Sequence, residues 1–142
     1  MTAPPLPAVV PMLSYADPGA AADWLVAAFG FRETFRLTDD DGVGGHVELA
    51  VGDGLVMLGC PSPHYEGPRR HAEHCESARR WRENPYVVDG VHVLVDDVDA
   101  HHRRAAAAGA VILSEPEDTP HGERRYRVED LEGHRWMVAQ RL

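Results

Sequence analysis

Residues 17–30 read Asp-Pro-Gly-Ala-Ala-Ala-Asp-Trp-Leu-Val-Ala-Ala-Phe-Gly, and residues 97–109 read Asp-Val-Asp-Ala-His-His-Arg-Arg-Ala-Ala-Ala-Ala-Gly. Each stretch begins with an Asp, a common N-cap residue, and ends with a Gly, which tolerates the left-handed backbone that often ends a helix. Pro18 also suits the first position of a helix. We therefore predict two equivalent helices, produced by an internal repeat.

Strand-like segments flank the two predicted helices in the same order. They cover residues 9–15, 31–38, 46–51 and 55–58 around the first helix, and residues 91–95, 111–113, 125–129 and 134–139 around the second. The pattern predicts an α+β fold in which two tandem βαβββ modules form curved sheets around a shared cleft. We expect one domain over residues 1–142, with modules at about 8–59 and 87–140. The connecting segment 60–86 should contain a short helix near 71–81.

Composition places the chain among globular proteins and excludes several classes of function. Its 142 residues are 44% hydrophobic and 26% charged, with a formal net charge of −9. Such an acidic balance argues against nucleic-acid binding, which depends on basic side chains. The sequence contains no lysine, so Schiff-base and P-loop chemistry are excluded. We expect a cytoplasmic protein without membrane association, because neither a signal peptide nor a long apolar run is visible.

Alternation along each strand divides its side chains between a helix-covered face and a cleft-lining face. Val91, Val93 and Val95 fit the helix-covered face, which leaves His92 and Leu94 facing the cleft. The same argument, applied to the other strands, predicts a ligand pocket lined by Met12, Ser14, His46, Glu48, Met57, His92, Leu94, Arg135 and Met137. A mostly apolar lining with a few polar groups is typical of a small-molecule site.

His46, Glu48 and His92 are the candidate catalytic residues. They would form a proton-transfer set, or an unconventional metal site, if the fold brings them together. The alternatives are that His46 is exposed after its Gly-rich turn, and that His92 is a hydrogen-bonded core residue. The methionines could likewise belong to the core.

The connecting segment allows several interpretations. Its Cys60, His71, His74 and Cys75 are zinc-type ligands, but their spacing matches no usual zinc motif, and a surface helix with a buried thiol is the alternative. The segment could cover the cleft as a lid. It could also form a dimer contact anchored by Trp81 and Tyr86.

The doubled βαβββ pattern resembles the vicinal-oxygen-chelate superfamily, which includes glyoxalases, extradiol dioxygenases, fosfomycin-resistance enzymes and bleomycin-resistance proteins. Residues 92–100, His-Val-Leu-Val-Asp-Asp-Val-Asp-Ala, and residues 126–140, Tyr-Arg-Val-Glu-Asp-Leu-Glu-Gly-His-Arg-Trp-Met-Val-Ala-Gln, carry the resemblance. The second string is similar to the Asp-Pro-Glu-Gly-His-x-Trp ending of glyoxalase-like members, with Leu131 in place of the proline. The resemblance covers about residues 8–140.

Metalloenzymes of this superfamily hold a divalent ion with His or Glu on the first and last strands of the modules. The corresponding positions in this chain are Val10, Met57, Gly90 and Met137. None of these side chains offers an oxygen or an imidazole to a divalent cation. The resemblance therefore implies that the usual metal site is missing, although a shift of two residues would place His92 at a ligand position.

We accordingly expect a small-molecule binding or sequestering protein that needs no metal or other cofactor and is similar to bleomycin-resistance proteins. Its ligand would be aromatic or cationic, and relatives of this size commonly form homodimers. The alternative is a glyoxalase- or dioxygenase-like enzyme, a lyase, isomerase or oxygenase, that uses His46, Glu48 and His92 with or without a divalent metal. A third interpretation is a regulatory or scaffold protein whose cleft is filled by its own methionines.

Overall fold

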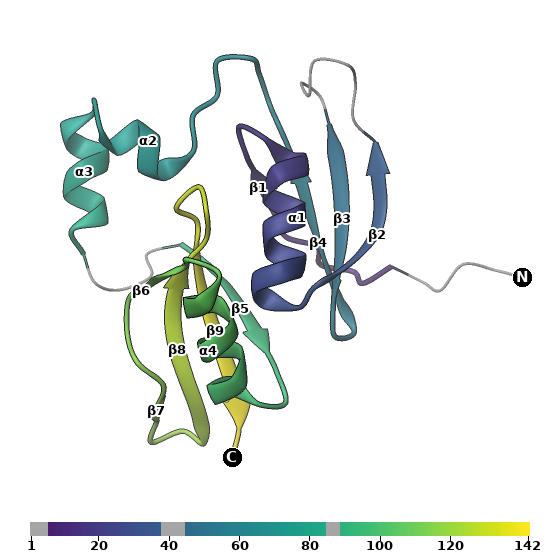
Figure 1. Ribbon diagram of the computed structural model, residues 1–142, viewed down its shortest axis with the longest axis vertical. Helices are drawn as coiled ribbons and strands as arrows, with labels where there is room; N and C mark the ends of the chain where they lie inside the picture. The colour runs from purple at the N-terminus through teal and green to yellow at the C-terminus, as the bar shows by residue number, and fades with distance from the viewer. Residues whose placement is uncertain (1–5, 38–44, 85–88) are drawn as a thin grey trace, which may run out of the picture.

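Each half of the chain forms one mixed β-sheet with one long helix packed against it (Figure 1). A computed structural model describes residues 6–37, 45–84 and 89–142. The first module comprises β1 (Met12–Ser14), α1 (Pro18–Phe29), β2 (Arg32–Leu37), β3 (His46–Val51) and β4 (Gly54–Gly59). The second comprises β5 (Val91–Leu94), α4 (Val98–Ala107), β6 (Val111–Ile112), β7 (Glu117–Asp118), β8 (Glu123–Glu129) and β9 (Arg135–Arg141). The predicted pair of βαβββ modules is confirmed, and β7 is an additional short strand.

The two sheets repeat the same topology. Strand order is β1-β4-β3-β2 in the first sheet and β5-β9-β8-β6 in the second, where β7 also pairs with β8. In each sheet the first strand runs parallel to the last, while the other pairings are antiparallel. Met57 therefore lies beside Met12, and Met137 lies beside His92 at the equivalent place.

Both predicted helix starts and the first helix end are confirmed by their capping contacts. The side chain of Asp17 accepts a hydrogen bond from the Ala20 N–H, and Asp97 accepts one from Ala100, each at 3.0 Å. Helix α1 ends at Gly30, whose positive φ of 75° suits glycine. Helix α4 has its C-cap at Ala108, one residue before the predicted Gly109, and the left-handed residue follows at Gly109, with φ of 89°.

The connection between the modules differs from the single helix expected near 71–81. It contains two short helices, α2 (Pro68–Ala72) and α3 (Glu76–Arg82). Cys75 interrupts the helical path because its backbone is extended, with φ of −126° and ψ of 110°. The expected anchor Tyr86 lies outside the described residues.

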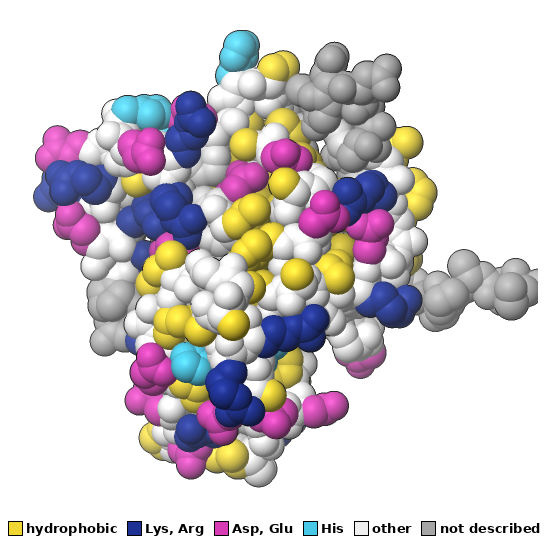
Figure 2. Space-filling view, viewed as in Figure 1, with side chains coloured by type: hydrophobic (Ala, Val, Ile, Leu, Met, Phe, Trp, Pro, Cys, Tyr) yellow, Lys and Arg dark blue, Asp and Glu magenta, His cyan; other side chains and the backbone are white. Residues whose placement is uncertain are grey.

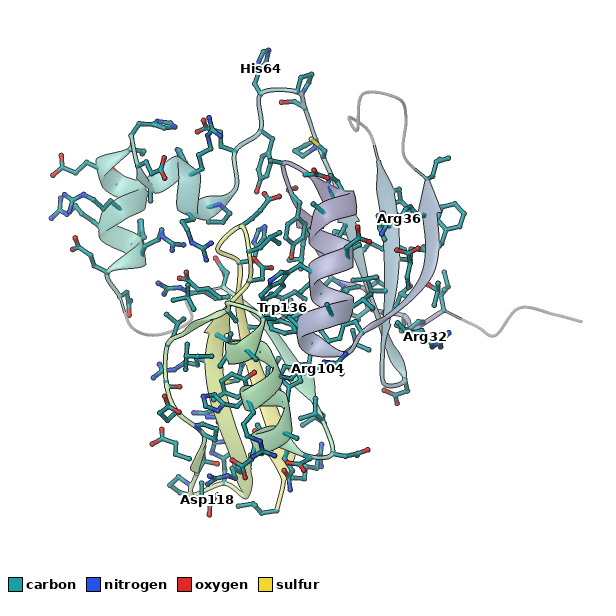
Figure 3. All side chains as sticks on the ribbon, viewed as in Figure 1. Arg32, Arg36, His64, Arg104, Asp118 and Trp136 are labelled. Carbon is teal, nitrogen blue, oxygen red and sulfur yellow. The ribbon has the colours of Figure 1, made fainter. Side chains whose placement is uncertain are left out.

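The hydrophobic core draws on both modules, and the helices α1 and α4 contact each other within it. Trp136 of β9 is fully buried and lies between the two modules in Figure 3. Its ring centroid is 5.6 Å from that of Phe29 and 5.5 Å from that of Phe31. Burial of such large aromatic side chains contributes strongly to stability. The helix-covered faces of both sheets therefore face this core.

The opposite faces of the sheets remain more open, as strand alternation predicts. On β3, Val47 and Leu49 are buried while His46 and Glu48 are partly exposed. On β5, Val93 is buried while His92 and Leu94 are exposed. Among the described helices, none is long and apolar enough to cross a membrane.

Candidate ligand site

A cavity of about 250 Å³ opens on the uncovered face of the first sheet. Four of the predicted pocket residues line it: Met12, Ser14, His46 and Met57. Strand pairing explains their meeting, because Met57 of the central strand β4 lies beside Met12 on one side and Glu48 on the other. The free thiol of Cys60 also lines this cavity. The lining is largely apolar, with polar groups on one side.

Two of the candidate catalytic residues are close to each other, and one of them, His46, lines this cavity, whereas Glu48 is not part of the lining. His46 Nε2 lies 3.4 Å from Glu48 Oε1, and both side chains are partly open to solvent. The Phe35 ring lies beside His46, with centroids 6.0 Å apart. A histidine beside a carboxylate can exchange protons with a bound molecule. The same pair can also bind a cationic ligand through the carboxylate.

The third candidate, His92, is not brought to this pair. Together with Leu94 it lines a different hollow, of about 260 Å³, which also includes the β3–β4 turn at Gly52 and Asp53. His46 begins β3, five residues from its other end at Val51, and five strand residues span about 16 Å. The expected set of His46, Glu48 and His92 is therefore divided between two places.

His92 has its own polar partners on the second sheet. Its Nε2 lies 3.5 Å from Glu123 Oε2, and His121 Nε2 lies 3.6 Å from the same oxygen. Met137 lies beside His92 on the neighbouring strand. The hollow that His92 lines is formed by strands of both modules.

Arg135 belongs to a third hollow, of about 460 Å³, between α3 and the start of β9. Its guanidinium donates to Glu129 Oε2 at 3.0 Å and to the carbonyl oxygens of Arg82 and Asn84 at 2.7 Å. Burial alone would raise the pKa of Glu129, but the hydrogen bonds and charges of Arg82 and Arg135 outweigh it and hold that pKa below its ordinary value. Arg135 therefore holds a buried carboxylate in place.

Comparison with known proteins identifies the family. Residues 9–138 match the family model described as the Glyoxalase/Bleomycin resistance protein/Dioxygenase superfamily. The chain belongs to this superfamily.

The chain is also similar to individual proteins. An uncharacterized protein of Mycobacterium bovis is 32% identical, with 94% of this chain and 83% of that protein covered. The crystal structure of TioX from Micromonospora sp. ML1 is 37% identical, with 94% and 97% of the two chains covered and a TM-score of 0.66. A glyoxalase/bleomycin resistance protein/dioxygenase family enzyme from Burkholderia phytofirmans shares the fold, at 17% identity and a TM-score of 0.63, with 94% of this chain and 97% of the other covered.

The superfamily's divalent metal does not fit the residues of this member. Met57 on β4 and Met137 on β9, the last strands of the two modules, carry thioethers, which are soft ligands. Within residues 6–37, 45–84 and 89–142, no group of three or more His, Cys, Asp and Glu side chains has a geometry that could hold a metal ion. The same result covers the zinc-type residues of the connecting segment, where His74 pairs with Glu66.

The superfamily's Asp-x-Glu-Gly-His-x-Trp string joins the two modules. Asp130 Oδ2 accepts hydrogen bonds from the Tyr15 hydroxyl at 2.6 Å and from Trp136 Nε1 at 3.0 Å. Glu132 accepts from the N–H groups of Ala16 and Asp17, at the start of α1. His134 Nε2 donates to the Ser14 carbonyl at 2.6 Å. These residues therefore position β1 and the start of α1.

Two features were not predicted from the sequence. Arg127 lies beside Met137 just as Glu48 lies beside Met57, so the first sheet carries an acid where the second carries a base. The repeat places Met57 and Met137 80 residues apart, and this spacing was a signal that could have identified the pair. The cluster of Arg69, Arg82 and Arg135 around Glu129 gave no comparable signal, because its members are distant in sequence.

Proposed function

We propose that the protein binds and sequesters a small planar molecule that carries a positive charge, in the cavity beside Met12 and Met57, and that this binding needs no metal. The observation that carries the proposal is the cross-strand row Met12–Met57–Glu48, in which the two methionines line the cavity and the carboxylate is on the strand next to Met57. Methionine side chains are flexible and polarisable, and they adapt to flat aromatic surfaces.

Charge supports a cationic ligand at this cavity. Glu48 supplies a carboxylate within the row, and the whole chain carries a formal net charge of −9. An acidic protein attracts cations over a distance, and a partly buried carboxylate then fixes their orientation. Sequestration requires a fitting cavity and no catalytic group.

In this proposal a second copy of the chain covers the open face of the first sheet and makes the protein a homodimer. Met12, Phe35 and Leu37 share that face with the cavity, and their exposed fractions are 81%, 47% and 62%. Grouped exposed apolar side chains of this size mark interaction surfaces. The unpaired cysteines Cys60 and Cys75 fit a reducing, cytoplasmic compartment.

The alternative is an enzyme of the glyoxalase or dioxygenase type. The proximity of His46 and Glu48 favours it, since the pair could move a proton on a bound substrate. The separate position of His92 and the poor fit of a divalent metal reduce the catalytic set to those two residues.

Calorimetric titration with two probes separates these functions. Ethidium and metal-free bleomycin are the probes, and each is added to the purified protein in excess EDTA. A parallel activity assay offers the glutathione hemithioacetal of methylglyoxal and catechol as trial substrates. The proposal predicts saturable binding of a cationic aromatic probe that EDTA does not change, without turnover of either substrate. Turnover that is lost in the His46→Ala variant would instead establish the enzyme.

A further inference from the structure

The hollow between α3 and β9 is separate from the cavity proposed above and is built by a different part of the chain. Pro68, Trp81 and Arg82 of the connecting segment form one side, and Gly133 to Arg135 form the other. Asp89 lies at its edge. At about 460 Å³ it is large enough for a bicyclic aromatic molecule.

The connecting segment is docked tightly against the second module, so this hollow is preformed. An added Cβ at Gly133 would lie 2.9 Å from the Arg69 backbone nitrogen, and one at Gly67 would lie 2.6 Å from Glu132 Oε1. The Arg69 N–H also donates to the Glu132 carbonyl at 3.0 Å. Two glycines thus allow the segment and the turn at residues 131–133 to approach closely.

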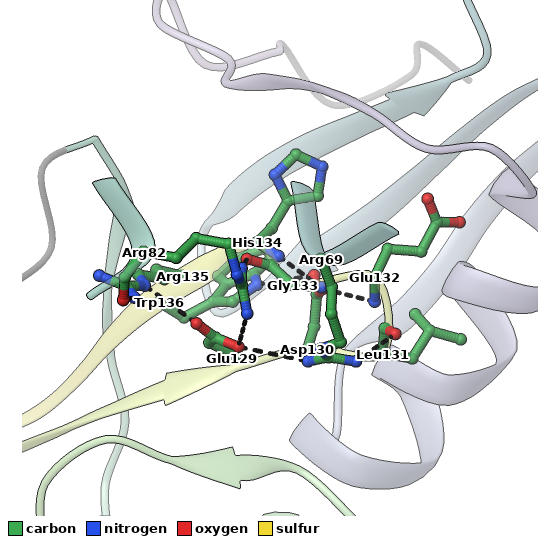
Figure 4. Close-up of polar contacts among 10 residues, drawn as sticks. All are labelled: Arg69, Arg82, Glu129, Asp130, Leu131, Glu132, Gly133, His134, Arg135 and Trp136. Carbon is green, nitrogen blue, oxygen red and sulfur yellow. Dashed lines mark hydrogen bonds and ion pairs between the residues drawn. The ribbon is translucent and has the colours of Figure 1, made fainter. Parts of the chain in front are cut away.

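Ion pairs hold the segment in place. None of the residues in α2 and α3 is buried. Arg69 and Arg82 instead converge on Glu129, which is 2% exposed, at 3.3 Å and 2.8 Å (Figure 4). Arg135 contacts the same carboxylate from β9. The wall of the hollow is therefore fixed by a buried charge cluster.

Basic side chains outnumber acidic ones among the residues that line the hollow. Arg82 and Arg135 line it together with one acid, Asp89. With Arg69 they surround the carboxylate of Glu129, and the acids Asp130 and Glu132 lie in the adjoining residues 130–132 (Figure 4). Figure 2 shows basic and acidic side chains intermixed over α2 and α3. An anionic group in the hollow would be attracted by the two guanidinium groups of its lining.

Trp81 supplies an aromatic surface at the same place. Its side chain is 64% exposed, and it lines both this hollow and a shallower one beside Ser77 and Arg80. Exposed tryptophans are costly to leave in water and are frequent anchors of bound molecules. Pro68, from the same segment, adds a second apolar surface to the lining.

We infer that this hollow is a second ligand site, which binds a planar aromatic anion, such as an aryl carboxylate, with its ring against Trp81 and its negative charge near Arg82 and Arg135. The inference stands independently of the proposed cavity beside Met12. That cavity lies beside Glu48, the strand neighbour of Met57, and favours cations, whereas this hollow favours anions.

The test is a calorimetric titration with 2-naphthoate and with the neutral 2-naphthalenemethanol at low ionic strength. We expect one naphthoate per chain, bound about fivefold more tightly than the alcohol, because the guanidinium charges act only on the anion. Trp81→Ala should weaken both probes about tenfold, because both rings use the indole. Leu6→Ala is the matched control, because Leu6 is also 64% exposed and lies outside the hollow.

A second test removes the negative charge of Asp89 and should strengthen binding rather than weaken it. Asp89→Asn should tighten naphthoate binding about threefold and leave the alcohol unchanged, because it removes a repulsive charge near the ligand. Asp53→Asn, an exposed acid on the β3–β4 turn, should change neither. Equal affinities for the two probes, no binding of either, an unchanged affinity in Trp81→Ala, or no response to Asp89→Asn would each overturn the inference. Ethidium binding beside Met12 is unaffected by any of these outcomes.

Discussion

The Tyr15 hydroxyl donates a 2.6 Å hydrogen bond to Asp130 Oδ2, although 115 residues separate the two in the chain. Tyr15 follows β1 of the first module and is fully buried, and Asp130 follows β8 of the second and is 1% exposed. Burial raises the pKa of Tyr15, and the nearby carboxylate of Asp130 raises it further, so the phenol stays a neutral donor. This contact fixes the two modules relative to each other.

Tyr15→Phe should therefore lower the free energy of unfolding by about 2 kcal/mol, because the buried carboxylate loses a donor. Urea unfolding followed by circular dichroism measures the loss. Tyr65→Phe is the control, because its hydroxyl donates to a neutral acceptor, the Ser14 carbonyl, at a half-buried place. The control should lose about 1 kcal/mol. Equal losses in the two variants would show that the Tyr15–Asp130 contact has no special weight.

The charge cluster at Glu129 predicts a local response to mutation. Glu129→Gln removes the negative charge that Arg69, Arg82 and Arg135 share. Because a buried ion pair is broken, the free energy of unfolding should fall by about 3 kcal/mol. Hydrogen exchange should accelerate over residues 68–82, which have no buried residues of their own, and should stay slow in α1. Unchanged protection over residues 68–82 would mean that other contacts hold the segment.

Stability should fall in mild acid because of His101. Burial, with a smaller contribution from the charge of Arg104, lowers the pKa of His101 to about 4. Between that value and about 6.5 the unfolded chain binds a proton that the folded chain does not, so stability falls as the pH falls through this window. The loss amounts to about 3 kcal/mol by pH 4.

The variant His101→Gln separates this effect from other titrations. Its side chain cannot gain a proton, so urea unfolding between pH 7 and pH 4 should show a smaller decrease in stability than the wild type. The His101 Nδ1 bonds to the Tyr126 hydroxyl at 2.6 Å, so the variant itself will be less stable at pH 7. If the free energy of unfolding fell equally with pH in the wild type and in His101→Gln, His101 would not be the cause of the loss.

The proposed dimer makes a prediction about the open face of the first sheet. Leu37→Glu places a charge among exposed apolar side chains without disturbing the core, since Leu37 is 62% exposed. Sedimentation equilibrium should give a dimer for the wild type and a monomer for the variant, with unchanged circular dichroism. A wild-type monomer at micromolar concentration would refute the dimer.

Local and repeated features could be predicted from the sequence. The Asp caps, the end of α1 at Gly30 and the alternation of Val47 and Leu49 with His46 and Glu48 depend on nearby residues, and they are confirmed. The presence of Met12 and Met57 on the open face of the first sheet follows from strand alternation.

Features that depend on contacts between the modules could not be predicted. The division of His46 from His92 results from how α1, α4 and Trp136 pack together, and no periodicity encodes that packing. The break at Cys75 and the capture of α2 and α3 by Glu129 depend on backbone conformation and on partners some 50 or 60 residues away. Such contacts form only when the chain has folded.

Metal-independent binding beside Met57 is tested most directly by the affinity of ethidium in excess EDTA for the wild type, Met57→Ala and Val111→Ala. The control Val111 is an exposed apolar residue of β6 outside the cavity. We expect EDTA to leave wild-type binding unchanged. Met57→Ala should weaken binding about tenfold through lost packing against the ring, whereas Val111→Ala should not. Binding that disappears in EDTA, or that Met57→Ala leaves unchanged, would contradict metal-independent binding in this cavity.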